Sequence, residues 1–563
     1  MASHLLIPFS STPVESIAPT VSRLQSTFTS LKTHPLAYRE EQLRKLYWGI
    51  KDNEQRLIQA LKADLGKPYF EAKVVEIDWT CADLLYVLKN LRKWAADDKV
   101  DLPLLHRLVL SPRIRKEPMG TVLVIGAFNY PAPLALAPLI GAIAAGNTAV
   151  IKPSEQAPHS AAVITRIIES ALDPEAYAVV NGSIPESTEL LNQKFDKICY
   201  TGNGAVGRIV ATAAIKHLTP VLLELGGLNP CFITKSADAK LAAKRIAWGK
   251  FHNLGQVCLA PDYVIIHPSL EAEFVGAFVQ TLKEFFPEGA SKSPDLGRIV
   301  NTRCYHRITE LLNNTKGTIL YGGGQDESRL FIEPTLVKIA SPEDSLLSEE
   351  IFGPLLPMLA VEDLDSMISV ARKVGDCPLA LYIFSGEKEE EEKILKNIRS
   401  GGATVNDVFF HAVLPSVPFG GVGESGTGSY RGKASFDAFT HRRPVVNQPL
   451  WMESQLRMRY PPFTPKKLDL MRKASGTTEP NFGRDGKLLR RSLVSWVLLL
   501  GAHSRKRAAF RYLLLMAGRK HTPLWQFVVL VLGECVKMRR HMVTMSRCPL
   551  QVLMRMKMQE LRC

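Results

Sequence analysis

The chain has 563 residues, of which 46% are hydrophobic and 22% charged, and no repeat is visible; this excludes a disordered protein, a collagen and a coiled coil. Its net charge of +15 comes from residues 447–563, where 23 Lys and Arg outnumber 6 Asp and Glu by 17, so the first 446 residues sum to −2. The nine cysteines are widely spaced and form no CxxC pair, so we expect no metal site and a reducing compartment, the cytoplasm.

The pattern of apolar residues predicts an α/β protein with two lobes. Residues 38–63 have the spacing of an amphipathic helix. From Thr121 on, short apolar runs alternate with helix-length stretches, and a second region of the same texture covers about 224–410. Strands that alternate with helices are typical of parallel sheets, so we expect two Rossmann-like lobes. The predicted strands are Thr121–Ile125, Thr148–Ile151, Tyr177–Val180, Lys197–Thr201, Tyr263–His267, Thr318–Leu320 and Leu379–Phe384, with helices at Ser160–Leu172 and Ala205–His217.

A glycine motif follows the strand predicted at Lys197–Thr201. The segment Gly202-Asn203-Gly204-Ala205-Val206-Gly207 matches GxGxxG and precedes a predicted helix, the order that lets backbone N–H groups face a pyrophosphate. The spacing is also that of a tight glycine turn, and this alternative stays open. Glu224 lies about where the ribose-binding acid of such a motif is expected.

Three further segments carry candidate reactive or binding groups. Cys258, in Gly-Gln-Val-Cys-Leu-Ala-Pro-Asp, is either a buried small residue or a nucleophile whose thiolate backbone donors stabilise. Asn129 follows a strand and either forms a turn or donates to an oxyanion. Lys152 and Glu155 end another strand, where ligands bind in parallel sheets, although a solvated surface turn would look the same.

Taken together and in this order, the motifs resemble those of the aldehyde dehydrogenase superfamily over residues from about 20 to about 446. The Gln-Val-Cys-Leu-Ala-Pro-Asp-Tyr form is similar to the class 3, or fatty aldehyde, branch. The segment beginning at Arg44 and the Gly-Glu-Ser-Gly variant look like fungal members, which include β-apo-4′-carotenal dehydrogenases. The motifs are Gly126-Ala-Phe-Asn-Tyr-Pro, Lys152-Pro-Ser-Glu, Thr201-Gly-Asn-Gly-Ala-Val-Gly, Leu223-Glu-Leu-Gly-Gly, Gly255-Gln-Val-Cys, Glu349-Glu-Ile-Phe-Gly-Pro and Pro418-Phe-Gly-Gly-Val-Gly-Glu-Ser-Gly.

The resemblance implies an NAD-dependent oxidation of an aldehyde to a carboxylic acid. Cys258 would be the nucleophile, and the Asn129 side chain with the Cys258 N–H would stabilise the oxyanion. Glu224 would be the base that activates water for thioester hydrolysis, which replaces its assignment to a ribose. A coenzyme A-dependent acylating enzyme and a non-catalytic scaffold are the alternatives, and retention of Glu224 weighs against the first.

The resemblance also implies how a dinucleotide binds. Residues 202–207 would border the nucleotide, Lys152 and Glu155 would reach the adenine-side ribose, and Glu350 and Phe352 would contact the nicotinamide side. Glu155 would repel a 2′-phosphate, so NAD is expected, with NADP as the alternative. Glu424 departs from the Asn that class 3 enzymes often carry there.

The implied domains are an NAD-binding domain over 1–223, a catalytic domain over 224–411 and a bridging segment over 412–446, with about 95–118 assigned to the bridging element as well. The class implies a homodimer, with Phe419–His441 near a subunit or domain contact. The substrate is expected to be a lipophilic aldehyde, an apocarotenal or alternatively a long-chain fatty aldehyde.

Residues 447–490 look like a linker, and 491–563 form a basic, Met-rich tail with three short apolar stretches. All three are shorter than the ~20 residues of a membrane-spanning helix. Basic clusters beside them suit attachment to an anionic membrane surface, which would place the protein on the cytoplasmic face of an internal membrane. A disordered tail or a reading-frame artefact is the alternative. Nucleic acid is disfavoured, because the basic residues alternate with aliphatic rather than aromatic side chains. The stretches are Leu493–Ala502, Tyr512–Ala517 and Leu524–Gly533.

Overall fold

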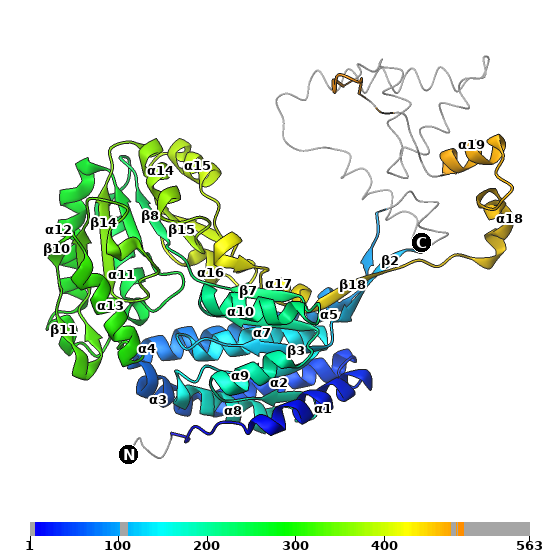
Figure 1. Cartoon of the computed structure of the whole chain (residues 1–563), viewed down its shortest axis with the longest axis horizontal. Coiled ribbons are helices and arrows are strands. Elements are labelled where there is room, and N and C mark those ends of the chain that lie inside the picture. Colours follow the sequence, from blue (N-terminus) through cyan, green and yellow to red (C-terminus); the bar gives the residue numbers. More distant parts are fainter. Residues whose placement is uncertain (1–5, 102–110, 475–479, 481, 489–563) are drawn as a thin grey trace, which may run out of the picture. The chain divides into compact units, whose positions relative to one another are not determined.

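The computed structural model describes residues 6–101, 111–474, 480 and 482–488 (Figure 1). The chain divides into two compact units. Met1–Asp97 with Arg115–Arg443 form the first, and Asp98–Ile114 with Pro444–Cys563 form the second. Every predicted site residue lies in the first unit, which contains two open sheets of mainly parallel strands. The predicted α/β architecture with two parallel-sheet lobes is therefore confirmed.

The first sheet has the strand order β17-β7-β6-β3-β4-β5, and only β17 is antiparallel to its neighbour. Alternate residues of its strands face different helices: Val122 and Val124 share a core with α7 and α8, whereas Leu123 shares one with α1 and α10. Burial on both faces explains why these strands are continuously apolar. The strands are β3 (Thr121–Ile125), β4 (Thr148–Lys152), β5 (Tyr177–Val179), β6 (Lys197–Thr201), β7 (Val221–Glu224) and β17 (Gly426–Thr427).

The helices of this lobe come largely from the first 215 residues. They are α1 (Ile17–Thr29), α2 (Leu36–Asp52), α3 (Glu54–Leu65), α4 (Tyr69–Glu71), a π-helical segment (Ala72–Asp78), α5 (Trp79–Ala95), α7 (Pro131–Ala145), α8 (Pro158–Ala171), α9 (Ile184–Asn192), α10 (Gly204–Ile215) and α17 (Gly432–Ala438). The single helix predicted over 38–63 is wrong, because it is two helices that meet at Asn53. The Asn53 side chain donates to the Gly49 backbone oxygen (2.9 Å), a local bond that competes with regular helix.

The second sheet has the order β10-β13-β14-β9-β8-β15-β16, with β10 antiparallel and the rest parallel. Helices α11 and α12 share a core with one face, and α13, α14 and α15 with the other. The strands are β8 (Pro230–Ile233), β9 (Tyr263–Ile266), β10 (Thr318–Tyr321), β13 (Thr335–Lys338), β14 (Leu355–Ala360), β15 (Ala380–Phe384) and β16 (Gly402–Val405). The helices are α11 (Ala239–Phe251), α12 (Pro268–Phe285), α13 (Thr302–Asn314), α14 (Leu364–Val374), α15 (Lys388–Asn397) and α16 (Phe410–Val413).

The two sheets divide between β7 and β8, so Glu224 ends the last parallel strand of the first sheet. The segment predicted as a bridge, 412–446, contributes β17 to that sheet and α17, which packs on α5 and α7. The predicted domain boundaries themselves stay predictions. Two small sheets complete the fold: β11 (Gln325–Asp326) with β12 (Phe331–Ile332), and β1 (Asp98–Lys99), β2 (Arg113–Pro118) and β18 (Thr440–Val445).

The second unit contains α18 (Glu453–Leu456) and α19 (Pro465–Ala474), both within the predicted linker 447–490. No helix among the described residues is long and apolar enough to cross a membrane. The three apolar stretches predicted in the tail lie outside the described residues.

Candidate active site

Cys258 lies in the loop between a 3-10 turn (His252–Gly255) and β9, and it is half-buried. Backbone N–H groups of Cys258 and Leu259 lie near its thiol. Asn229 holds this loop in place, because its Nδ2 donates to the backbone oxygens of Cys258 (2.8 Å) and Ala260 (3.0 Å). The sulfur therefore sits on a fixed loop beside backbone donors.

A close backbone approach joins this loop to the segment that carries Glu350 and Phe352. Gly255 has φ +76°, and a Cβ there would lie 2.3 Å from the backbone oxygen of Gly353. A glycine satisfies both constraints, since it adopts positive φ readily and has no side chain to clash. Two motifs nearly 100 residues apart in sequence are thus adjacent in space.

Asn129 follows β3 and is 2% exposed. Its Nδ2 donates to the backbone oxygen of Gln256 (3.1 Å), two residues before Cys258. An amide nitrogen carries two hydrogens, so this bond leaves one for another acceptor. The structure thus brings Asn129 to the cysteine loop, whereas a simple turn former would not need a buried side chain.

Glu224 is 2% exposed, and neither of its carboxyl oxygens has a hydrogen-bond partner among the described residues. Burial raises the pKa of Glu224 well above its ordinary value. An unpartnered buried carboxyl is costly in a folded protein, so its retention suits a group that meets water or a ligand during function.

Glu224 and Glu350 both act electrostatically on Cys258, so the three side chains lie in the same region of the protein. Burial raises the pKa of the Cys258 thiol, the Glu350 and Glu224 carboxyls raise it further, and the two backbone N–H groups lower it. The sequence predicted backbone donors that stabilise a thiolate. The donors are present, but burial and the two carboxyls outweigh them, so the resting group is a thiol.

Glu350 is half-buried beside the Gly226-Gly227 pair. Burial raises the pKa of Glu350 well above its ordinary value and the nearby Gly227 N–H lowers it, while its Oε1 has no hydrogen-bond partner among the described residues. A Cβ on Gly226 would lie 1.9 Å from the Glu350 Oε2, so a side chain there would displace this carboxyl. Phe352 makes an edge-to-face contact with Phe128, next to Asn129, with ring centroids 5.8 Å apart.

The predicted glycine motif has the expected strand, turn and helix. Gly202 follows β6, and Asn203 caps α10 by accepting a hydrogen bond from the Val206 N–H (2.9 Å). A Cβ on Gly207 would lie 2.8 Å from Leu225, so this glycine allows close packing of the helix on the strand segment. Gly204 and Ala205 form the first turn of α10. The Asn203 cap already uses one of the N–H groups that a phosphate would meet.

Lys152 ends β4, next to the end of β3 where Asn129 follows. Its side chain is 4% exposed and its Nζ lies 2.8 Å from Glu155, whose side chain is 36% exposed. The buried lysine excludes a fully solvated surface turn. Lys152 and Glu155 thus form an ion pair at the carboxyl edge of the first sheet.

Sequence reasoning missed several buried polar residues that hold the site. Asn229 is one of them. Lys67 and Glu76 are two others, and both contact the segment that begins at Asn129. Asn229 directly precedes an apolar strand, and the segment Gly66-Lys67-Pro68 looks like a surface turn. Because lysines are mostly exposed, no local signal identifies a buried one.

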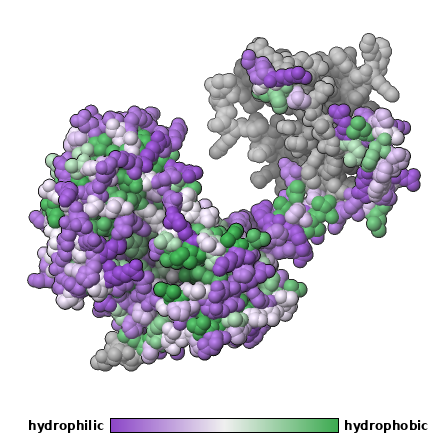
Figure 2. Space-filling model, viewed as in Figure 1, coloured by the Kyte–Doolittle hydropathy of each residue, from purple (hydrophilic) through white to green (hydrophobic). Residues whose placement is uncertain are grey.

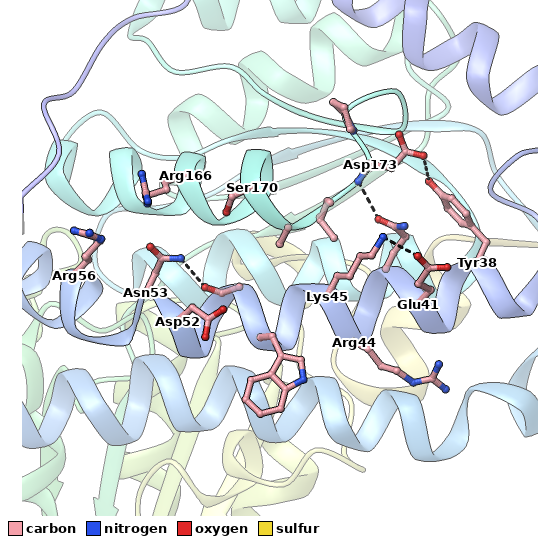
Figure 3. Close-up of a pocket in the computed structure, with 16 residues that line it drawn as sticks. Tyr38, Glu41, Arg44, Lys45, Asp52, Asn53, Arg56, Arg166, Ser170 and Asp173 are labelled. Atoms are coloured by element: carbon pink, nitrogen blue, oxygen red, sulfur yellow. Dashed lines mark hydrogen bonds and ion pairs between the residues drawn. The ribbon is translucent and has the colours of Figure 1, made fainter.

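A groove of about 950 Å³ lies on the surface between α2, α3 and α8 (Figure 3). Charges of both signs line it, among them Glu41, Arg44, Lys45 and Arg166, together with the ring of Trp48. It contains none of the predicted site residues. Among the described residues, no group of three or more His, Cys, Asp or Glu could hold a metal ion.

Residues 5–445 match the aldehyde dehydrogenase family. The chain belongs to this family. The resemblance stated from the motifs is therefore confirmed, and the protein is an aldehyde dehydrogenase, an oxidoreductase of a family that uses NAD or NADP. The matched range contains all thirteen predicted site residues.

Several relatives and one solved structure illustrate the similarity of this aldehyde dehydrogenase. A Neurospora crassa protein named β-apo-4′-carotenal oxygenase is 46% identical over 517 residues, which cover 91% of this chain and 96% of that protein. A dog protein named aldehyde dehydrogenase, dimeric NADP-preferring, is 43% identical over 460 residues, 80% of this chain and 99% of that protein. Mammalian relatives named aldehyde dehydrogenase family 3 member A2 are 42–43% identical, which confirms the class 3 resemblance.

The solved structure, entitled substrate-bound state of Staphylococcus aureus AldH, has a TM-score of 0.78 and 40% identity to this aldehyde dehydrogenase. The matched region covers 82% of this chain and 99% of the chain in that structure. The predicted aldehyde dehydrogenase fold is thereby confirmed.

Proposed function

We propose that this aldehyde dehydrogenase oxidises a lipophilic aldehyde to its carboxylic acid through a thioester on Cys258, with NAD as the preferred cofactor. The convergence of Cys258, Asn129 and Glu224 carries the proposal. The proposed oxyanion donor bonds to the loop that carries the nucleophile, and a buried carboxyl from a third segment acts electrostatically on that nucleophile.

The reaction begins when the Cys258 sulfur bonds to the aldehyde carbon and its proton passes to a water molecule. The carbonyl π electrons move to oxygen, and the Asn129 Nδ2 and the Cys258 N–H donate to the resulting alkoxide. Each donor is worth about 3 kcal/mol of barrier. When bound, NAD supplies the acceptor for the hydride that leaves the same carbon with two electrons. Cys258 then holds a thioester.

Hydrolysis completes the reaction and restores the thiol. Water attacks the thioester carbon while Glu224 takes its proton, which its raised pKa favours near neutrality. The carbon–sulfur bond breaks, the sulfur leaves as a thiolate and regains a proton, and the carboxylate departs. Because water is the acyl acceptor, coenzyme A is not required.

The residues present fit a dinucleotide at the carboxyl edge of the first sheet. The unpartnered, buried Oε1 of Glu350 suits a ribose hydroxyl donor, and the Gly202–Gly207 turn at the start of α10 would border the nucleotide. Lys152 and Glu155 would hold the adenine-side ribose. The Glu155 carboxylate repels a 2′-phosphate, but its ion pair with Lys152 offsets part of that charge. We therefore expect NAD to be preferred and NADP to be used.

Aromatic side chains around His252, six residues before Cys258, support a lipophilic substrate. Tyr130 stacks on His252 with centroids 6.2 Å apart, and Trp248 contacts Phe409 at 5.5 Å. Burial raises the pKa of Tyr130, and the nearby Cys258 raises it further. The Neurospora relative is named for an apocarotenal, so we propose an apocarotenal as substrate. A long-chain fatty aldehyde is the second candidate, favoured by the class 3 similarity, and ranking kcat/KM over both separates them.

We also propose a homodimer through α10. Val206, Ile209, Ile215 and Leu218 are 39–82% exposed on or just after this helix, and Figure 2 shows hydrophobic residues gathered on the face of the molecule that displays α10. The dog relative is named dimeric, and a second copy would cover these side chains. Ile209→Glu should shift the sedimentation coefficient to that of a monomer. The Phe419–His441 contact stays a prediction.

For the tail, we propose attachment to the cytoplasmic face of an internal membrane. Its support is the sequence alone, because 489–563 lie outside the described residues. The full chain should sediment with anionic vesicles and a chain ending at residue 488 should not. Equal sedimentation of both would contradict the proposal.

The Cys258→Ala variant tests the central proposal. With a long-chain aldehyde and NAD, but no coenzyme A, it should produce no NADH above the background rate. Cys304→Ala is the matched control, because Cys304 is also half-buried but lies on α13. Full turnover by Cys258→Ala, or an absolute need for coenzyme A, would show the proposal to be wrong.

A further inference from the structure

Lys67 is a lysine buried completely inside the protein, beside the Asn129 segment. Its side chain is 0% exposed, as is that of Glu76, and its Nζ lies 2.5 Å from the Glu76 Oε1. A buried ion pair is costly to form, since both charges leave water, so it is weak evidence for stability alone. Its partners therefore indicate what it does.

The Lys67 ammonium also contacts the segment that carries Asn129, the proposed oxyanion donor. It donates to the backbone oxygen of Asn129 (2.8 Å) and lies over the ring of Tyr130, 4.1 Å from the centroid. Three donor directions of one ammonium thus meet a carboxylate, a carbonyl and an aromatic face. Two of these three belong to consecutive residues, 129 and 130.

The other oxygen of Glu76 fixes the next part of the same segment. Its Oε2 accepts a hydrogen bond from the Ala132 N–H (3.1 Å) in the first turn of α7. Lys67 and Glu76 together hold residues 129–132, from the end of the β3 loop to the start of the helix.

A second donor completes the environment of the Asn129 carbonyl. The Nδ2 of Asn253 donates to that oxygen (3.0 Å) and to the backbone oxygen of Gln256 (3.1 Å). Asn253 adopts φ +49°, a left-handed conformation uncommon outside glycine, and its N–H is held by Glu71 (3.1 Å). The Asn129 carbonyl therefore accepts two hydrogen bonds, one from Lys67 and one from Asn253.

We infer that Lys67 is a positioning residue for the oxyanion donor: it orients the Asn129 peptide so that the side-chain amide points at the cysteine loop. This rests on the proposed function, in which Asn129 stabilises the alkoxide. A displacement of about 1 Å can cost about 100-fold in rate, so loss of the Lys67 bond is expected to lower hydride transfer about 10- to 100-fold.

A double-mutant cycle tests this, with single-turnover rates of hydride transfer measured in the presence of saturating NAD. Lys67→Met should lower the rate about 10- to 100-fold in the otherwise native protein. In the Asn129→Ala background it should lower the rate less than about twofold, because the group that Lys67 orients is absent. NAD affinity should change less than twofold in every variant. If the buried Glu76 prevents Lys67→Met from folding, Lys67→Met/Glu76→Gln replaces it, since the amide oxygen still accepts from Ala132.

Arg39→Met is the matched control. Arg39 is a buried cation that donates to the backbone oxygen of Ala144 (3.2 Å) at the opposite end of α7. Its loss should lower Tm but leave hydride transfer unchanged. Equal losses for Lys67→Met in both backgrounds, or a matching loss in Arg39→Met, would overturn the inference while leaving the proposed function intact. An undiminished rate in Asn129→Ala alone would instead overturn the proposed function, and the inference with it.

Discussion

The side-chain amide of Asn129 donates to the backbone oxygen of Gln256, 3.1 Å away and two residues before Cys258. Together with the bond from Asn253 to the Asn129 backbone oxygen, it joins the carboxyl end of β3, in the first sheet, to the loop that enters β9, in the second. The reaction proposed for Cys258 depends on the bond from the Asn129 amide, because the oxyanion donor and the sulfur must keep a fixed position relative to each other.

Replacement of Asn129 by Ala is expected to slow hydride transfer about 100-fold, which corresponds to about 3 kcal/mol of lost transition-state stabilisation. The KM for the aldehyde should change little, because the donor acts on the alkoxide and not on the free carbonyl. Stopped-flow absorbance of NADH measures this rate. Asn147→Ala is the control: Asn147 is equally buried, but it bonds to Ala142 and Phe439, so it should lower Tm only.

Replacement of Glu224 by Gln should separate the two halves of the reaction. Hydride transfer does not need the base, so the variant should release about one NADH per site in a rapid burst and then turn over at least 100-fold more slowly. Intact-mass analysis should then show the acyl group on the protein, lost on treatment with hydroxylamine. A burst absent from the variant, or steady turnover at the wild-type rate, would contradict the role of Glu224.

The raised pKa of Glu224 predicts a pH-dependent stability difference. A carboxyl with a higher pKa in the folded than in the unfolded protein contributes its full stability below the unfolded pKa of about 4.3, and this is lost as pH rises through the folded pKa. Glu224→Gln cannot ionise, so its Tm should rise relative to the wild type between pH 5 and 8.5. Scanning fluorimetry across this range measures the difference. A constant difference would show that Glu224 has an ordinary pKa.

Addition of a methyl group at Gly226 should weaken cofactor binding. The new Cβ would lie 1.9 Å from the Glu350 Oε2, so Gly226→Ala must displace that carboxyl. We expect the Kd for NAD, measured by calorimetry, to rise at least tenfold. Gly276→Ala is the matched control in α12, where a Cβ meets nothing within 4 Å. It should leave the Kd unchanged and stabilise the protein by about 0.5–1 kcal/mol.

The strands that frame the site were predictable because both faces of a parallel sheet are buried. Continuous apolar runs such as Thr121–Ile125 and Lys197–Thr201 then have few alternatives, and the structure forms both strands over those residues. The helix break at Asn53 was not predictable from spacing, because a polar side chain that bonds back to Gly49 leaves the apolar period unchanged.

By itself, the sequence determined which residue types stand at the ends of which strands. It thereby identified Cys258, Asn129 and Glu224 as candidate site residues. Only the tertiary structure decided that they lie near one another, because contacts such as the bond from the Asn129 amide to the Gln256 backbone oxygen depend on how two separate sheets pack. The same packing buries Lys67 and raises the pKa of Cys258. Burial and charge proximity are properties of three-dimensional neighbours, and no local pattern of residues encodes them.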